Sequence, residues 1–183
     1  MLFSHDTELA LIQTAALVNT LDDGVDSLAS LADLDAFLVR YPMSGVRRRT
    51  NDELGQVQRL RGRLRVLWTM ADRDQAAVQI NAILVEADAR PYLSKHDELD
   101  WHLHVTDPEA PLADRLAGEA AMAILDLVRA DDLGRLRTCA AGDCEAVLVD
   151  LSRNSSKRYC DTGNCGNRAN VAAYRTRKRQ QSG

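Results

Sequence analysis

The sequence predicts a mainly α-helical protein with one small β-hairpin, in which a helical N-terminal body precedes a small cysteine-bearing C-terminal module. Hydrophobic residues make up 45% of the 183 residues and aromatic residues only 4%, so Leu, Ala, Val and Ile must build the core. Such a composition favours helices. Apolar residues recur at helical spacing through much of the first 130 positions, and all four cysteines lie within residues 139–165.

Two helices are expected at the start of the chain. The first begins at Asp6 or Thr7, either of which can cap it, and runs to about Leu21 before the turn of residues 22–24. The second ends at Pro42, which cannot continue a helix. Its inward-facing positions are Leu31, Leu34 and Leu38.

A third helix is predicted behind Thr50 and Glu53, which have the spacing of a capping box. Its arginines alternate with a long apolar stripe, and we expect them to form a solvated face with aliphatic stems rather than an anion site. These are Arg59, Arg61, Arg63 and Arg65. A fourth helix is expected over residues 74–87.

The periodicity then changes to the alternation of a half-buried strand. Trp101, Leu103 and Val105 alternate with His102 and His104, and residues 91–93 provide a pairing segment across a polar loop. The two histidines would share one face, where they either bind a metal or belong to a polar sheet surface. We favour the polar surface, because the sequence offers no evident third ligand.

A long helix follows Pro111, and residues 131–134 form the expected boundary. The predicted division is therefore a helical domain over residues 1–134 and a finger over residues 135–183. The net charge of −4 is unevenly distributed across these parts, since residues 135–183 carry +6 and residues 1–134 carry −10. A basic end on an acidic body suits a polyanionic partner, although a solvated tail would have the same composition.

The cysteines occur as two pairs, Cys139 with Cys144 and Cys160 with Cys165, separated by a hairpin-sized segment. Two pairs of thiols at this separation are typical of a structural zinc site, because zinc binds four thiolates tetrahedrally. An iron–sulfur cluster, a pair of disulfides or inert buried thiols are the alternatives. We predict one Zn²⁺ per chain, in a closed site that offers no position for catalytic water.

The segment after Cys165 is expected to form a basic helix fixed by the metal. On a helical wheel, Arg168, Arg175 and Arg179 lie within about 40° of one another. Arg158 and Arg168 flank the second cysteine pair and are candidates to balance the negative charge of a zinc–thiolate site. A basic helix held in this way suits nucleic acid.

The C-terminal segment resembles the CGNR zinc finger. The resemblance covers residues 136–179 and includes Cys165-Gly166-Asn167-Arg168, the other three cysteines, Asp150, Ser152-Arg153-Asn154, Arg158 and Ala172-Ala173-Tyr174-Arg175. It implies a treble-clef-like finger in which the four cysteines bind zinc and the finger binds DNA. The body is similar to the ABATE domain of stress-induced transcription regulators, with Leu17-Val18-Asn19-Thr20-Leu21 matching its opening motif.

We therefore expect a bacterial, cytoplasmic, zinc-dependent DNA-binding transcription regulator. The expected DNA contacts are Arg153, Lys157, Arg158, Arg168, Arg175, Arg177, Lys178 and Arg179. The alternatives are a zinc-stabilised protein-interaction module and a small-molecule sensor without direct DNA binding. DNA is the expected partner, a small-molecule effector and a homodimer are further partners to consider, and no membrane association is expected.

No nucleophile–base pair, phosphate loop or paired carboxylates support catalysis, so we expect no enzyme activity. The ligand of the body is unknown from the sequence, and Asn19 and Arg47, Arg48 and Arg49 are its weak anion-site candidates.

Overall fold

The computed structural model describes residues 3–95 and 101–181 and confirms the mainly α-helical class. Its helices are α1 (His5–Val18), α2 (Leu31–Arg40), α3 (Asn51–Arg65), α4 (Arg73–Glu86), α5 (Leu112–Arg129) and α6 (Cys165–Gln181), with short 3₁₀ turns η1 (Val66–Thr69) and η2 (Leu133–Arg135). The strands are β1 (Leu21–Asp22), β2 (Val25–Asp26), β3 (Tyr92–Ser94), β4 (His102–His104), β5 (Leu136–Thr138) and β6 (Val147–Val149). They form the antiparallel hairpins β1–β2, β3–β4 and β5–β6. No described helix is long and apolar enough to cross a membrane.

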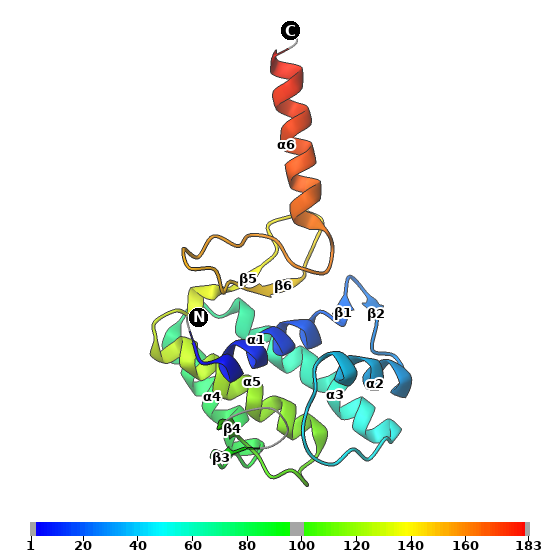
Figure 1. Ribbon diagram of the computed structural model, residues 1–183, viewed down its shortest axis with the longest axis vertical. Coiled ribbons are helices and arrows are strands. Elements are labelled where there is room, and N and C mark those ends of the chain that lie inside the picture. Colours follow the sequence, from blue (N-terminus) through cyan, green and yellow to red (C-terminus); the bar gives the residue numbers. More distant parts are fainter. Residues whose placement is uncertain (1–2, 96–100, 182–183) are drawn as a thin grey trace.

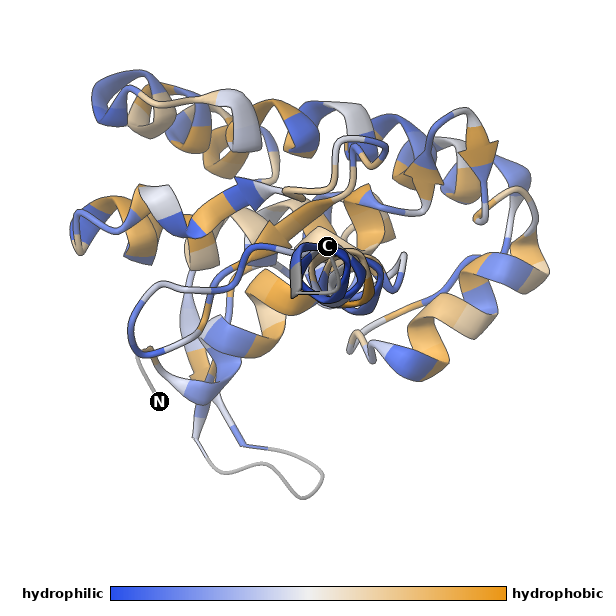
Figure 2. Ribbon diagram, turned by 90° about the horizontal axis from the view of Figure 1, so that it is seen from above, coloured by the Kyte–Doolittle hydropathy of each residue, from blue (hydrophilic) through white to orange (hydrophobic). Residues whose placement is uncertain are grey.

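Helix α5 is the centre of the body. It packs against α4, α1 and α3, and its buried side includes Leu116, Ala120, Ile124 and Leu127. The β5–β6 hairpin lies across one end of this bundle, while α6 extends away from it (Figure 1). Seen from above, α6 is viewed end-on and is largely hydrophilic, whereas the helices of the body alternate hydrophobic and hydrophilic segments (Figure 2). The architecture is therefore a helical body that carries a projecting basic helix.

The first two helices agree with the expected order but not with every boundary. Ser4 caps α1 by accepting a bond from the amide of Thr7, and the helix ends at Val18 rather than near Leu21. The difference arises because the chain enters the β1–β2 hairpin, whose turn uses Asp23 and Gly24 at positive φ. Helix α2 ends at Arg40, and Leu34 is its only fully buried residue.

The expected solvated arginine face on α3 is wrong for two of its four members. Arg61 is only 4% exposed and forms a two-pronged ion pair with Asp26 of β2, at 2.6 and 2.8 Å. Arg65 crosses to the main-chain carbonyls of Val18, Leu21 and Glu145. Arg61 and Arg65 lie one turn apart on the side of α3 opposite the exposed Arg59 and Arg63, and their guanidinium groups find partners on elements distant in sequence.

The capping box at the start of α3 is half formed. The Thr50 hydroxyl accepts a bond from the Glu53 amide, as predicted. The buried Glu53 carboxylate instead accepts bonds from the backbone amides of Arg48 and Arg49 and from the Arg47 side chain. Arg47 and Arg49, two of the weak anion-site candidates, also pair with Asp35.

The β3–β4 hairpin pairs as predicted, with Leu93 opposite Leu103. Its burial is not as predicted, because Trp101 and Leu103 are 66% and 39% exposed and only Val105 is buried. His102 and His104 do share a face, with their Nε2 atoms 3.0 Å apart. Most of the expected polar loop, residues 96–98, lies outside the described residues.

Candidate metal centre and basic helix

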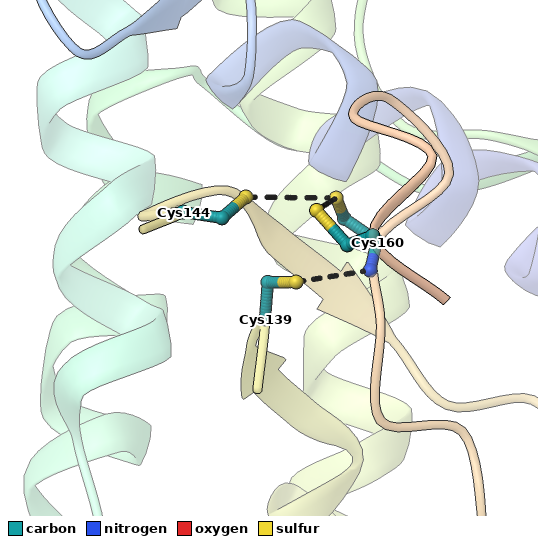
Figure 3. A group of neighbouring side chains, drawn as sticks. Cys139, Cys144 and Cys160 are labelled. Carbon is teal, nitrogen blue, oxygen red and sulfur yellow. Dashed lines mark hydrogen bonds between the residues drawn. The ribbon is translucent and has the colours of Figure 1, made fainter. Parts of the chain in front are cut away.

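The four cysteine sulfurs meet at one point between the β5–β6 hairpin and α6. Cys139 follows β5, Cys144 lies in the turn that leads to β6, Cys160 lies in the loop before α6, and Cys165 begins that helix. All four Sγ atoms lie within 4.8 Å of one another, and the Cys144–Cys160 and Cys160–Cys165 separations are 3.7 and 3.8 Å. Figure 3 shows Cys139, Cys144 and Cys160 pointing toward one another. Zinc–sulfur bonds of about 2.3 Å in a tetrahedron place sulfurs about 3.8 Å apart. The donor set and its spacing therefore fit one zinc ion.

The surroundings of the cysteines act on their thiols in opposite directions. Burial works against ionisation of Cys160, but the Thr162 side chain and the amides of Thr162 and Gly163 lower the pKa of this thiol to about 6. Burial raises the pKa of the Cys144 thiol to about 12, and the other cysteines add to the effect. Since all ligands must be deprotonated, zinc binding releases protons from the cluster.

Arg168 supplies positive charge beside the cysteines. Its guanidinium donates to the Cys165 sulfur at 3.1 Å and forms a two-pronged pair with Asp143 at 2.6 and 3.2 Å. The hydrogen bonds from Arg168 also lower the pKa of the Asp143 carboxyl. The arginine thus lies where a site with four thiolates, net charge −2, gains from a cation.

A turn around Asp150 shapes the loop between β6 and the second cysteine pair. Asp150 is fully buried, and its carboxylate accepts bonds from Ser152, from the Lys157 amide and from Arg137. Burial opposes ionisation, but these donors lower the pKa of the carboxyl below its ordinary value. The turn leaves Arg153 and Asn154 exposed at its tip.

Three side chains of the body hold strand β6 in place. The Asn19 amide both donates to the Val147 carbonyl and accepts from the Val147 amide, each at 2.8 Å. The Trp68 indole donates to the Leu148 carbonyl at 2.9 Å, and Arg65 donates to the Glu145 carbonyl at 3.1 Å. The finger is therefore bonded to the body through its main chain.

The hydrophobic contacts of β6 divide between two clusters. Val147 and Val149 belong to the large core of the body, together with Leu136 of β5. Leu148, between them, belongs to a small cluster with Cys139, Cys160 and Cys165. Alternation along the strand thus directs two side chains to the body and one to the cysteines.

Helix α6 is exposed along almost its whole length. Its sequence contains no acidic residue and five basic ones, Arg168, Arg175, Arg177, Lys178 and Arg179. Val171 and Tyr174 are 48% and 59% exposed. Arg175, Arg177, Lys178 and Arg179 are all exposed, and the helix that carries them extends away from the body (Figure 1).

The expected DNA contacts fall into two groups. Arg153, Arg158, Arg175, Arg177, Lys178 and Arg179 are exposed, and Arg158 lies 6.0 Å over the Tyr159 ring. Lys157 is half-buried and pairs with Asp161 at 2.6 Å, and Arg168 is engaged by Asp143 and Cys165. The last two side chains are thus committed to partners within the finger.

Sequence reasoning missed the residues that join the two parts of the chain. Asn19 was considered as an anion ligand, but it completes the edge of β6. Arg135 and Arg137 add to the positive charge of the finger, yet both point inward to the carbonyls of the 150–157 loop. The available signal was the Asp150-x-Ser152 pattern, since short acidic and hydroxyl residues favour such turns.

Two family models match the chain. The first, ABATE, described as "Putative stress-induced transcription regulator", matches residues 12–131. The second, the CGNR zinc finger, matches residues 135–178. Neither is an enzyme family by its description. No curated protein matches the chain.

Proposed function

Because the chain belongs to the ABATE family and carries a CGNR zinc finger, we propose that it is a transcription regulator that binds DNA through the finger. In this proposal, the four cysteines hold a structural zinc ion that fixes the start of α6. Exposed basic residues of α6 and of the 150–158 loop contact the DNA backbone. The acidic body holds the finger and carries any regulatory input.

The observation that carries the proposal is the exposed, acid-free helix α6. Its 17 residues span about 25 Å at 1.5 Å per residue. A helix of ordinary diameter enters the major groove, which is about 12 Å wide. Because α6 stands clear of the body, duplex DNA approaching it meets few other parts of the protein.

The charge distribution supports the same assignment. The segment of residues 135–183 carries +6, and the rest of the chain carries −10. DNA contact is therefore favourable only where the finger projects from the body, and the acidic body disfavours additional non-specific contacts. A closed four-thiolate site leaves zinc without an open position, so its role here is structural.

The test is DNA binding by the zinc-loaded full chain, measured by fluorescence anisotropy over a range of salt concentrations. The logarithm of the binding constant should fall linearly with the logarithm of the salt concentration, because each neutralised phosphate releases about one counterion. The full chain is required, because a finger cut at residue 135 would expose Leu136, Val147 and Val149, which belong to the body's core. Absence of DNA affinity at low salt would overturn the proposal.

A protein-docking role is the second candidate, and the exposure of Val171 and Tyr174 on α6 favours it. The two side chains lie three positions apart and therefore on one face of the helix. If zinc-loaded protein does not bind DNA, this face is the surface to test for a protein partner. Val171→Ser and Tyr174→Ser would then weaken partner binding without changing zinc content.

A further inference from the structure

A cleft of about 430 Å³ opens between the body and the finger. Helix α1 contributes Ile12 to its wall, α2 contributes Phe37 and Arg40, and β6 contributes Val147 and Val149. The loop before α6 closes the remaining side with residues 157, 161 and 162. The volume falls within the ordinary range for small-molecule sites, about 300–1,000 Å³. Secondary-structure elements from both matched regions therefore line one space.

The lining of the cleft combines apolar side chains with the polar residues Asn19, Thr20 and Ser27, and its charged groups are Arg40, Lys157 and Asp161. Phe37 and Tyr41 are tilted aromatic neighbours with ring centroids 5.0 Å apart. The exposed Arg40 guanidinium lies 5.5 Å over the Tyr41 ring, and no carboxylate pairs with it among the described residues. Lys157 is a second cation at the cleft, held by the largely exposed Asp161. This combination suits an organic molecule with an apolar or aromatic part and one carboxylate.

The cleft also lies next to the metal centre. Thr162, which lines it, donates from its hydroxyl to the Cys160 sulfur at 3.4 Å. Lys157 and Asp161 flank the same cysteine in sequence. On the opposite wall, α2 is the most weakly buried helix of the body, with Leu34 as its one fully buried residue. A bound molecule would thus connect a lightly held helix to the loop that carries a cysteine ligand.

We infer that this cleft binds a small organic carboxylate, with the apolar part against Ile12, Phe37 and Val149 and the carboxylate at Arg40. Its occupancy tightens α2 against the finger loop and so affects the position of α6. The binding site stands independently of DNA recognition, but its regulatory meaning depends on the proposed function. The ligand is the effector through which the body would act on the finger.

The chain carries its own reporter for this site. Leu148 lines the cleft, and its carbonyl accepts the hydrogen bond from the Trp68 indole. Trp101, the only other tryptophan, lies at the β3–β4 hairpin and serves as an internal reference. In ¹⁵N-labelled zinc-loaded protein, the two indole resonances can be followed separately during titration with 3-phenylpropionate.

We expect the Trp68 indole resonance to shift in a saturable manner, with a dissociation constant on the order of 1 mM for so small a probe. The neutral 3-phenylpropanamide should bind about tenfold more weakly, because it lacks the charge that pairs with the guanidinium. Arg40→Gln should lower the affinity for the acid to that for the amide and leave the amide unchanged. Arg129→Gln, an exposed arginine at the end of α5, is the matched control and should bind like the parent.

Three outcomes would overturn the inference. One is a Trp68 resonance that stays fixed up to about ten times the expected dissociation constant. Another is equal affinity for the acid and the amide, and the third is equal movement of both indole resonances. DNA binding is measured on the same samples. DNA affinity without a Trp68 response refutes the cleft alone, whereas a Trp68 response without DNA affinity refutes the proposed function alone.

Discussion

The indole N–H of Trp68 donates a 2.9 Å hydrogen bond to the main-chain carbonyl of Leu148, across 80 positions of sequence. Trp68 is buried in the 3₁₀ turn after α3, and Leu148 lies at the centre of β6. The bond joins the body to the strand whose other side faces the cysteines. It fixes the β5–β6 hairpin to the body, whose core includes Leu136, Val147 and Val149 of this hairpin.

Trp68→Phe should lower the free energy of unfolding by about 1–3 kcal/mol, because the Leu148 carbonyl is left buried without its donor. Urea unfolding followed by circular dichroism measures the change. Trp101→Phe is the matched control, since Trp101 is 66% exposed and should change stability by less than about 0.5 kcal/mol. Equal effects of the two substitutions would contradict the structural role of this bond.

Purified protein should contain about one zinc per chain by elemental analysis, and Cys160→Ser should lose it. Chelation should melt α6 and the cysteine loops, because an exposed helix of this length is marginal without its anchor. Helices α1 to α5 should persist, with a lower unfolding temperature, because β5 and β6 contribute to their core. Re-addition of zinc should restore the lost ellipticity. Iron in the purified protein would show that the zinc assignment is wrong, and complete unfolding on chelation would show that the body does not fold without the metal.

Replacing Arg175 and Arg179 together by Gln should reduce the slope of log binding constant against log salt concentration by about 2, if each side chain contacts one phosphate. Both side chains are exposed on α6, so zinc content and folding should stay unchanged. Arg59→Gln with Arg129→Gln gives a control of equal charge change on the exposed surface of the body. The same loss of slope in the control would mean that net charge, rather than α6, determines the affinity.

Arg168→Gln separates charge on α6 from support of the metal centre. The substitution removes the donor to the Cys165 sulfur and the pair with Asp143. Zinc affinity should fall about 10- to 100-fold, as is usual when a group bonded to a metal ligand is removed. Competition with a chromogenic chelator measures this affinity. Arg175→Gln lies about two turns further along the same helix face and should leave the zinc affinity unchanged.

Glu119 should make the stability of the body depend on pH. Burial raises the pKa of its carboxyl to about 7 from 4.5, opposed by the Val105 amide and assisted by the charge of Asp6. Between these values the folded state retains a proton that the unfolded state releases, so stability falls as pH rises through this window. Glu119→Gln should therefore be more stable than the parent at about pH 8, by about 1–3 kcal/mol, and similar to it at about pH 4. Parallel stability curves for the two proteins would contradict this.

The features that the sequence predicted are those set by neighbours in the chain. Pro42, Thr50 and Pro111 each mark a helix boundary through local sterics or capping, and the structure agrees to within a few residues. The spacing of the cysteines likewise indicated a metal site, because each pair is positioned by its own short turn. The alternation around Leu103 predicted the β3–β4 hairpin, though not which side of it is buried.

The features that the sequence did not reveal depend on contacts between distant segments. Helical geometry places Arg61 and Arg65 on the side of α3 opposite Arg59 and Arg63, but nothing local indicates that the partner of Arg61 is Asp26, 35 positions away. The two bonds between Asn19 and Val147 join residues 128 positions apart. The freedom of α6 is also a tertiary property, because an amphipathic pattern cannot show whether a helix finds a surface to pack on.

The Asn19–Val147 pairing has a consequence for how the chain is made. A ribosome produces α1 before β6, and Asn19 and Val147 are 128 positions apart, so the end of α1 stays without these bonds until β6 has emerged. Two cysteines precede β6 and two follow it, so the metal site is complete only after Cys165 has also emerged. A chain interrupted before residue 147 leaves apolar surface of the body uncovered and becomes a substrate for chaperones and proteases.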